Sequence, residues 1–250
     1  MSGFMIKVIA IICMTIDHLF KLSPELIDLI PKFSIPLPGI TLSFPEIISL
    51  LGRIAFPLFA FGVAEGCVHT RNFPKYLRRL FIFALISELP FDYMFYGGFT
   101  MSAQNVMWTF FFGVFAVFLY EKLKATRILG IFAVLIVAIV CYFFNTDYKS
   151  LGVILIFAMY AIKNKPLKIS AVFILICLYY FFYRGLYNDI LMQNTERIIS
   201  QCMYLGTMLL SVPIMASYNG RRGLGMKWFF YIYYPLHIIV LGSVDKLWIF

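Results

Sequence analysis

The sequence predicts an all-α fold, a polytopic bundle of about nine transmembrane helices in a single domain covering residues 1–250. Of the 250 residues, 62% are hydrophobic and only 13% are charged, whereas about a quarter of the residues of a soluble domain are charged. Uncharged stretches recur along the whole chain, and many approach the roughly 20 residues that a helix needs to cross about 30 Å of hydrocarbon. Little sequence is left for a separate soluble domain.

Nine apolar runs give the expected spans. They are Met5–Leu22, Ile47–Val68, Tyr76–Tyr96, Val106–Tyr120, Ile128–Phe144, Leu151–Ile162, Ile169–Tyr183, Ile198–Ala216 and Trp228–Trp248. The first run leads directly into Asp17 and His18 rather than into a small-residue cleavage site. We therefore interpret it as a retained helix and not as a signal peptide.

The charges of the connecting loops orient the bundle. Every second loop is basic, whereas the intervening loops are nearly neutral. The basic loops contain Arg71, Lys75, Arg78 and Arg79, then Lys122, Lys124 and Arg127, then Lys163, Lys165 and Lys168, and finally Arg221, Arg222 and Lys227. Because loops rich in Lys and Arg stay in the cytoplasm, we expect a cytoplasmic N-terminus and an external C-terminus. This topology and anionic lipid headgroups explain the net charge of +9 better than nucleic acid does.

Other features near the membrane surface predict anchoring and packing rather than chemistry. The first outer loop, residues 23–45, contains five prolines, and its Leu26–Ile30 stretch is expected to lie along the interface as a helix or a re-entrant turn. Trp108, Trp228 and Trp248 near span ends are interpreted as interfacial anchors. The five cysteines have no paired spacing, which favours small packing residues over disulfides or metal ligands.

Polar side chains inside the spans are the main indication of function. Inserting a charged side chain at bilayer depth costs about 2.5 to 3.5 kcal/mol of free energy, so each such residue needs an interaction partner or a functional role. In the first span, Lys7 and His18 are eleven residues apart. Eleven residues is close to three helical turns, so both lie on roughly one face, about 16 Å apart. Asp17 precedes His18, Arg53 lies one turn into the second span, and His237 lies inside the last. His237 alone is equally typical of a hydrogen-bonded core histidine.

A second group of polar residues lies where the third and fourth spans meet. Glu88 and Asp92 flank Pro90 at the end of the third span, and Gln104 and Asn105 open the fourth. Gln104 and Asn105 have two structural alternatives, since they can cap the fourth helix or form hydrogen bonds between helices.

Several of the charged residues also have purely structural interpretations. Glu65 and His69 are four residues apart, so they can form a pair that only fixes a helix end. They are also too few ligands to indicate a zinc site. Lys7 can be a cytoplasmic flank of its span, and Arg78 and Arg79 can be topology determinants alone.

Seven motifs follow one another in a fixed order along the chain. They are Lys7 with Asp17-His18, then Gly52–Phe61, Glu65–Asn72, Lys75–Leu80, Ser87–Asp92, Gln104–Val106 and Phe230–His237. In this order they resemble the TraX family of bacterial membrane proteins, and the resemblance covers essentially the whole chain. The family's namesake is associated with N-terminal acetylation of conjugative pilin, and the family resembles the wider group of transmembrane acyltransferases.

The resemblance implies an acyltransferase, and more narrowly an acetyltransferase, in the bacterial cytoplasmic membrane. It would move the acyl group of cytoplasmic acyl-CoA, here acetyl-CoA, to an acceptor protein or a surface polysaccharide at or beyond the outer face. In the wider group, a basic residue lies about three turns before a histidine of the first helix, and an arginine pair follows later. Lys7, His18 and the pair Arg78-Arg79 match this pattern, with Lys7 in place of the commoner arginine.

The chemistry of acyl transfer suits these positions. A base must remove the proton of the acceptor, and a histidine with a pKa near 6.5 is suited to neutral pH, which makes His18 the candidate base. A carboxylate can hold the tautomer of the imidazole and stabilise its charged form. Asp17 is adjacent but points about 100° away, so Glu88 or Asp92 is an alternative.

The same resemblance suggests where charge must be stabilised. Arg53, Asn105 or His237 is the expected donor to the tetrahedral oxyanion. The phosphates of coenzyme A are expected to meet the cytoplasmic cations, which are Lys7, Arg71, Lys75, Arg78 and Arg79. The expected partners are thus acyl-CoA, the acceptor and membrane lipid, without metal and without nucleic acid.

Two other classes of function stay open. A secondary transporter of a small polar solute would also bury charged residues near the midplane, but it commonly has an internal repeat. No repeat is visible here, and the polar residues are dense in the first four spans and sparse in the next four. A non-catalytic membrane assembly factor is the third class.

Overall fold

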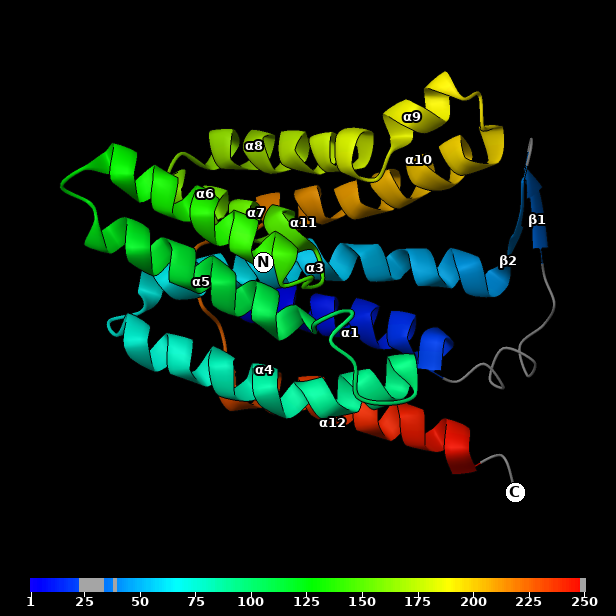
Figure 1. Ribbon diagram of the computed structural model, residues 1–250, viewed down its shortest axis with the longest axis horizontal. Helices are drawn as coiled ribbons and strands as arrows, with labels where there is room; N and C mark the ends of the chain where they lie inside the picture. The colour runs from blue at the N-terminus through cyan, green and yellow to red at the C-terminus, as the bar shows by residue number, and fades with distance from the viewer. Residues whose placement is uncertain (23–33, 38–39, 248–250) are drawn as a thin grey trace. The chain divides into compact units, whose positions relative to one another are not determined.

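The computed structural model describes residues 1–22, 34–37 and 40–247 (Figure 1). Within these residues every predicted apolar run is helical, and its ends lie within a few residues of the predicted ones. The helices are α1 (Gly3–Leu22), α3 (Phe44–His69), α4 (Phe73–Tyr96), α5 (Val106–Lys122), α6 (Arg127–Phe143), α7 (Lys149–Ala161), α8 (Lys165–Leu178), the π-helix η1 (Tyr179–Tyr183), α9 (Leu186–Leu191), α10 (Thr195–Leu209), α11 (Ser211–Ala216) and α12 (Lys227–Leu247).

A small β-hairpin interrupts the helices of the described residues. Strands β1 (Ser34–Leu37) and β2 (Ile40–Ser43) are antiparallel, with Ser34 paired to Ser43. Isoleucine and threonine favour extended backbone, which suits these residues to strands in a proline-rich loop. The predicted interfacial segment Leu26–Ile30 lies outside the described residues, as does Trp248.

Three helical stretches of the described chain are long and apolar enough to cross a membrane. They are Phe44–His69, Lys165–Tyr183 and Thr195–Ala216, while Arg127–Phe143 and Lys149–Ala161 are shorter apolar helices. On α6, Phe132 and Ile136 are more than half exposed although both are apolar. Such a surface suits lipid rather than water. The chain is therefore a helical membrane protein, and nine spans with a cytoplasmic N-terminus remain a prediction.

The chain forms two compact units. Unit 1 consists of Met1–Phe59, Ile169–Gly225 and Val240–Phe250, and unit 2 consists of Ala60–Lys168 and Met226–Ile239. The boundary between Phe59 and Ala60 falls inside α3. The organisation of residues 1–250 as one acyltransferase-like domain stays a prediction.

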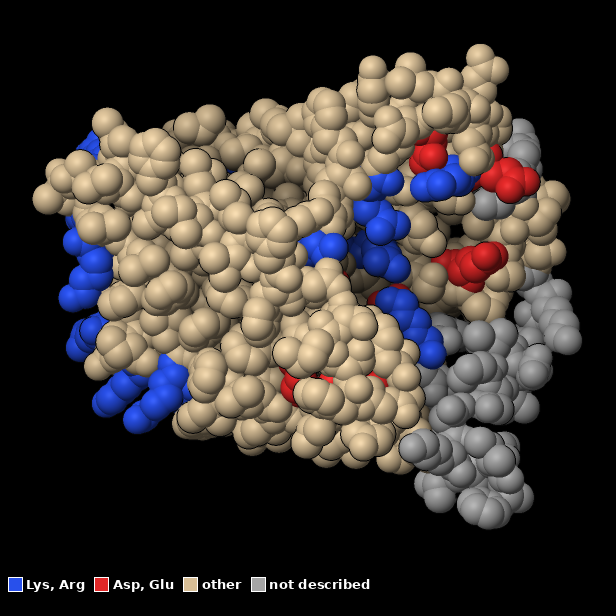
Figure 2. Space-filling model, viewed as in Figure 1, with Lys and Arg blue, Asp and Glu red and all other residues tan. Residues whose placement is uncertain are grey.

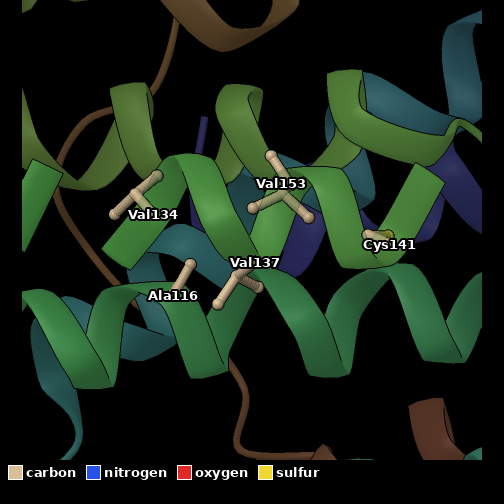
Figure 3. Close-up of a cluster of buried hydrophobic side chains, with 6 residues drawn as sticks. Ala116, Val134, Val137, Cys141 and Val153 are labelled. Atoms are coloured by element: carbon tan, nitrogen blue, oxygen red, sulfur yellow. The ribbon is translucent and has the colours of Figure 1, made fainter. Parts of the chain in front are cut away.

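The core of unit 2 is built around α5, which packs against α4, α6 and α7. Small buried side chains let these helices approach closely, as Figure 3 shows for Ala116, Val134, Val137, Cys141 and Val153. Close approach through small residues is the usual means by which membrane helices associate, since lipid supplies no hydrophobic driving force between them. Helix α4 packs against α5 in the same unit, and the polar residues of unit 2 lie where the end of α4 meets the start of α5.

In unit 1 the start of α1 is fixed by the loop after α11. The amides of Gly3 and Phe4 donate to the carbonyl oxygens of Arg221 and Arg222, at 2.9 and 3.0 Å. These bonds satisfy N–H groups that the first turn of a helix otherwise leaves without partners. Gly223 has a φ of 73° and any Cβ there would overlap Phe4, so a glycine is required. The contact places the basic loop beside the first turns of α1.

Candidate functional site

Lys7 and His18, the predicted cation and histidine, both lie on helix α1. Lys7 and His18 are both half-buried. Lys7 interacts electrostatically with Arg222, which the loop contact brings to the same end of the helix. Two cations close together form a favourable environment for an anion such as a phosphate. Lys7 and Arg222 thus lie at the same end of α1, and both interpretations of Lys7, as a phosphate ligand or as a flank of its span, stay open.

Asp17 is fixed by its own helix and by α3. Its side chain is buried, with 7% of its surface exposed, and its Oδ2 accepts a hydrogen bond from Lys21 Nζ at 2.6 Å. A Cβ added to Gly52 would overlap the Asp17 side chain, so the glycine permits this close packing of α1 and α3. Asp17 Oδ1 has no hydrogen-bond partner among the described residues. One carboxylate oxygen thus remains available to a ligand or a moving side chain.

Arg53 is positioned by an aromatic neighbour on α10. Its guanidinium carbon lies 5.1 Å from the centroid of the Tyr204 ring, a cation–π distance. Arg53 also interacts electrostatically with Tyr180 of η1. The guanidinium is therefore held on the face of α3 that meets η1 and α10 within unit 1.

In unit 2 the ends of α4 and α5 meet at Glu88. Glu88 Oε2 accepts hydrogen bonds from Asn105 Nδ2 and, at 2.7 Å, from Trp108 Nε1. Trp108 is buried, so its interpretation as an interfacial anchor was wrong. It lies in the first turn of α5, whose start Asn105 fixes, and the indole N–H is thereby directed at the carboxylate. The structure thus adds Trp108 to the polar group that the sequence indicated.

Asn105 fulfils both structural alternatives at once. Its Oδ1 caps α5 by accepting from the Met107 amide at 3.0 Å, while Nδ2 donates to Glu88 and, at 2.9 Å, to the Ala84 carbonyl oxygen. An amide nitrogen has two hydrogens, and both are used here. No N–H of this side chain is left for an oxyanion, which favours a role in positioning Glu88.

Two carboxylate oxygens in this group are buried without partners. Asp92 is completely buried, and its Oδ2 accepts from the Thr100 amide at 3.2 Å. Among the described residues, Asp92 Oδ1 and Glu88 Oε1 have no hydrogen-bond partner. The two residues are one helical turn apart and interact electrostatically. Together they form an acidic pair whose remaining oxygens can accept a proton or an N–H group.

His237 joins the same unit from α12. Its Nδ1 lies 2.9 Å from the Tyr233 carbonyl oxygen, and its ring stacks on Tyr233 and contacts Tyr234. A carbonyl oxygen only accepts, so Nδ1 carries the hydrogen and Nε2 of the neutral ring carries a lone pair. A neutral His237 is thus better suited to accept a proton than to donate to an oxyanion. Tyr234 links it electrostatically to Glu88.

The two arginines at the start of α4 have different surroundings. Arg78 is exposed, whereas Arg79 is half-buried, with its guanidinium 5.7 Å from the centroid of the buried Tyr76 ring. Arg79 also interacts electrostatically with the Tyr231 hydroxyl of α12. Its Nε is buried and has no hydrogen-bond partner in the described part of the chain. Arg79 is therefore a fixed cation with an unused donor, and Arg78 is not.

Other cations surround this end of unit 2. Arg71 and Lys75 are exposed, and Asn72 caps α4 by accepting from the Lys75 amide at 2.9 Å. Figure 2 shows Lys and Arg side chains gathered over the start of α4 and the turn between α5 and α6, with no acidic side chain among them in this view. This basic end is where the sequence predicts the cytoplasmic loops.

Glu65 and His69 form the predicted pair at the end of α3. His69 Nε2 lies 3.6 Å from Glu65 Oε2, and Lys168 Nζ lies 3.7 Å from Glu65 Oε1. His69 is largely exposed, so its bond to Glu65 fixes a helix end and needs no catalytic explanation. Across the described residues, no three His, Cys, Asp or Glu side chains are grouped to hold a metal ion.

The predicted site residues fall into two groups. Unit 1 holds Lys7, Asp17, His18 and Arg53, and unit 2 holds Glu88, Asp92, Asn105 and His237 together with Arg71, Lys75, Arg78 and Arg79. Sequence reasoning missed the aromatic partners, namely Tyr76, Trp108, Tyr204, Tyr231 and Tyr234. In an aromatic-rich membrane chain, such residues give no signal that separates a positioned ring from a lipid-facing one.

Comparisons with known proteins give a family match and a curated relative. Residues 2–245 match the family described as "TraX protein". The chain is also similar to a curated protein of Dichelobacter nodosus, described as "Probable fimbrial assembly protein FimC, serogroup H1". The two are 28% identical over 256 residues, which cover 97% of this chain and 95% of the relative. No solved structure matches the chain.

Proposed function

The chain belongs to the TraX family, and from this premise we propose that it is a membrane-embedded acetyltransferase. It transfers the acetyl group of cytoplasmic acetyl-CoA to an acceptor at or beyond the outer face of the bacterial cytoplasmic membrane. The observation that carries the proposal is the family match over residues 2–245, because the family is linked to pilin acetylation. The acceptor is a protein amine or the hydroxyl of a surface glycan.

The basic end of unit 2 supports binding of the donor. Coenzyme A carries several phosphate charges, and a planar guanidinium binds phosphate with two parallel hydrogen bonds. Arg79 has a buried Nε–H without a partner among the described residues and is fixed by Tyr76. Arg71, Lys75 and Arg78 add exposed positive charge at the same end of unit 2.

His18 is the proposed base. As the acceptor nitrogen or oxygen attacks the acetyl carbonyl carbon, the imidazole takes the acceptor's proton. The tetrahedral oxyanion collapses, the C–S bond breaks, and the leaving thiolate takes that proton from the imidazolium. Asp17 precedes His18 on α1 and has one unpartnered oxygen among the described residues. A carboxylate near an imidazolium stabilises its positive charge.

The remaining candidate residues are proposed to stabilise the oxyanion and to position other polar groups. Arg53 is the best oxyanion donor of the three predicted, since both N–H bonds of Asn105 are used and the neutral His237 ring carries a lone pair at Nε2. Asn105 and Trp108 hold Glu88 in place. Within unit 2, the remaining oxygens of Glu88 and Asp92 are suited to accept hydrogen bonds from N–H or O–H groups of a substrate.

A non-catalytic role in pilus assembly is the second candidate, and one observation favours it. The relative from Dichelobacter nodosus is described as a fimbrial assembly protein, with no enzymatic activity in its description. The two candidates differ in what a catalytically inactive chain can do. An assembly factor would support pili after loss of His18, whereas an acetyltransferase would leave the acceptor unmodified.

Mass spectrometry of the envelope tests the proposal in the cell. Exported proteins and surface polysaccharides are compared between cells with the chain, cells without it, and cells that carry the His18→Ala variant. We expect one acceptor to lose the mass of a single acetyl group both in the deletion strain and in the variant strain. An unchanged acetylation pattern in both strains would contradict the acetyltransferase.

A further inference from the structure

We propose that an aromatic cluster beside Arg79 binds the purine ring of the coenzyme A nucleotide. The cluster consists of Trp228 and Tyr231 of α12 and Phe83 of α4, and we call it the Trp228 platform. This inference rests on the proposed function, because it names the part of acetyl-CoA that this end of unit 2 recognises. All four residues lie in unit 2, and the structure describes every residue of that unit.

Two helix faces meet at the Trp228 platform, where α4 and α12 lie side by side (Figure 1). Arg79 and Phe83 are four residues apart on α4, and Trp228 and Tyr231 are three apart on α12, so each pair shares a helix face. The Phe83 and Tyr231 rings stack, with their centroids 5.1 Å apart and their planes inclined at 24°. The Trp228 ring lies 6.4 Å from the Phe83 ring and 6.3 Å from the Tyr231 ring, measured between centroids. The three rings therefore form one continuous cluster.

Trp228 is the accessible member of the platform. Its side chain is 52% exposed, whereas Phe83 and Tyr231 are half-buried. The two half-buried rings thus support an indole that still has free surface. Exposed aromatic rings on a fixed support are suited to stack with nucleobases, because every base has a π-face.

Cations border the platform on α4 and on α12. Arg79 interacts electrostatically with the Tyr231 hydroxyl, and its buried Nε has no hydrogen-bond partner in the part of the chain that the structure describes. Lys227 Nζ lies 5.6 Å from the centroid of the Trp228 ring. Guanidinium and ammonium groups both bind phosphate. A ligand with a flat ring and phosphate groups close together complements this arrangement, and a nucleotide has both.

Membrane anchoring is the other role that an exposed tryptophan near a helix end commonly has. A phospholipid headgroup would meet the cations, but it has no flat ring to stack on the indole. In coenzyme A, the adenine and its neighbouring phosphates form one end of the molecule, and the thioester forms the other. The Trp228 platform is therefore expected to add affinity for the donor without contacting the reacting carbon.

Equilibrium binding to the full chain in an uncharged detergent tests the platform with three probes. Coenzyme A carries the whole ligand, adenosine 3′,5′-bisphosphate carries the nucleotide alone, and 4′-phosphopantetheine carries a phosphate without the purine. We expect Trp228→Leu to weaken the first two about tenfold, the effect of one lost stacking contact, and to leave the third unchanged. Trp228→Phe keeps a ring and should lose less. Unchanged affinity for coenzyme A in a folded Trp228→Leu chain overturns the proposal.

Phe132→Leu is the matched control, because Phe132 is an aromatic residue of α6 in the same unit and is more than half exposed. This variant should bind all three probes as the unchanged chain does. An equal loss in both leucine variants would mean a general effect of lost aromatic surface and would refute the platform.

The same measurements separate the platform from acetyl transfer. Nucleotide binding that depends on Trp228, in a chain that releases no coenzyme A from acetyl-CoA, would keep the platform and remove the acetyltransferase. Acetyl transfer with coenzyme A affinity unchanged in Trp228→Leu would keep the acetyltransferase and remove the platform. Equal affinity of the unchanged chain for coenzyme A and 4′-phosphopantetheine would also contradict the platform, since the purine would then add nothing.

Discussion

Replacing His18 by alanine is expected to lower the rate of acetyl transfer by at least about a hundredfold, the usual contribution of a general base. The imidazole is proposed to take the acceptor's proton, and alanine cannot replace it. The helix should persist, because alanine has the highest helix propensity and His18 is only half-buried. The rate is measured as coenzyme A release by the purified chain, and membrane insertion is checked in parallel.

The matched control for this prediction is His69→Ala. His69 also lies on a membrane helix, α3, and forms an exposed contact with Glu65 at 3.6 Å. Exposed pairs of this kind contribute little, so the turnover of this variant should stay close to that of the unchanged chain. Full turnover in an inserted, folded His18→Ala chain would remove His18 from the mechanism, and equal losses in both variants would indicate a general effect on folding.

The second large effect is expected at Arg79. Arg79→Gln should raise the KM for acetyl-CoA by roughly tenfold to a hundredfold, the range of one lost charge-assisted hydrogen bond. A phosphate far from the reacting carbon is bound equally in the ground state and the transition state, so kcat should stay nearly constant. Steady-state kinetics with varied acetyl-CoA concentration measures the two constants separately.

Arg78→Gln is the control for Arg79, because it removes the same charge from the next residue. Arg78 is exposed and should affect KM only weakly, whereas Arg79 is half-buried beside Tyr76. Tyr231→Phe removes the hydroxyl beside Arg79 while keeping the ring, and it should raise KM less than Arg79→Gln does. Equal effects of the Arg78 and Arg79 variants would mean that only the total charge of this loop matters.

The helices were predictable because lipid imposes a simple rule on sequence. An apolar run without charges ends where a loop begins, so the run Val106–Tyr120 became α5 (Val106–Lys122) and Ile128–Phe144 became α6 (Arg127–Phe143). The hairpin β1–β2 was missed because four-residue strands in a proline-rich loop resemble irregular structure. The run from Ile198 to Ala216 is divided between α10 and α11. This break was not predicted, because the run is apolar on both sides of it.

The site was predictable where residue spacing alone fixes a contact. Glu65 and His69 are four residues apart and meet, and Asn105 caps α5 as its position before an apolar run indicated. The difference between Arg78 and Arg79 was not predictable, because it depends on which face of α4 meets α12.

The most direct test of acetyl transfer uses the purified chain in liposomes, with acetyl-CoA labelled in the acetyl group on the side of the basic loops. An envelope extract from cells that lack the chain is supplied on the opposite side as the source of acceptor. We expect free coenzyme A and labelled acceptor to form in equal amounts, with neither formed by the His18→Ala variant. A folded chain that releases no coenzyme A and labels no acceptor would contradict the acetyltransferase.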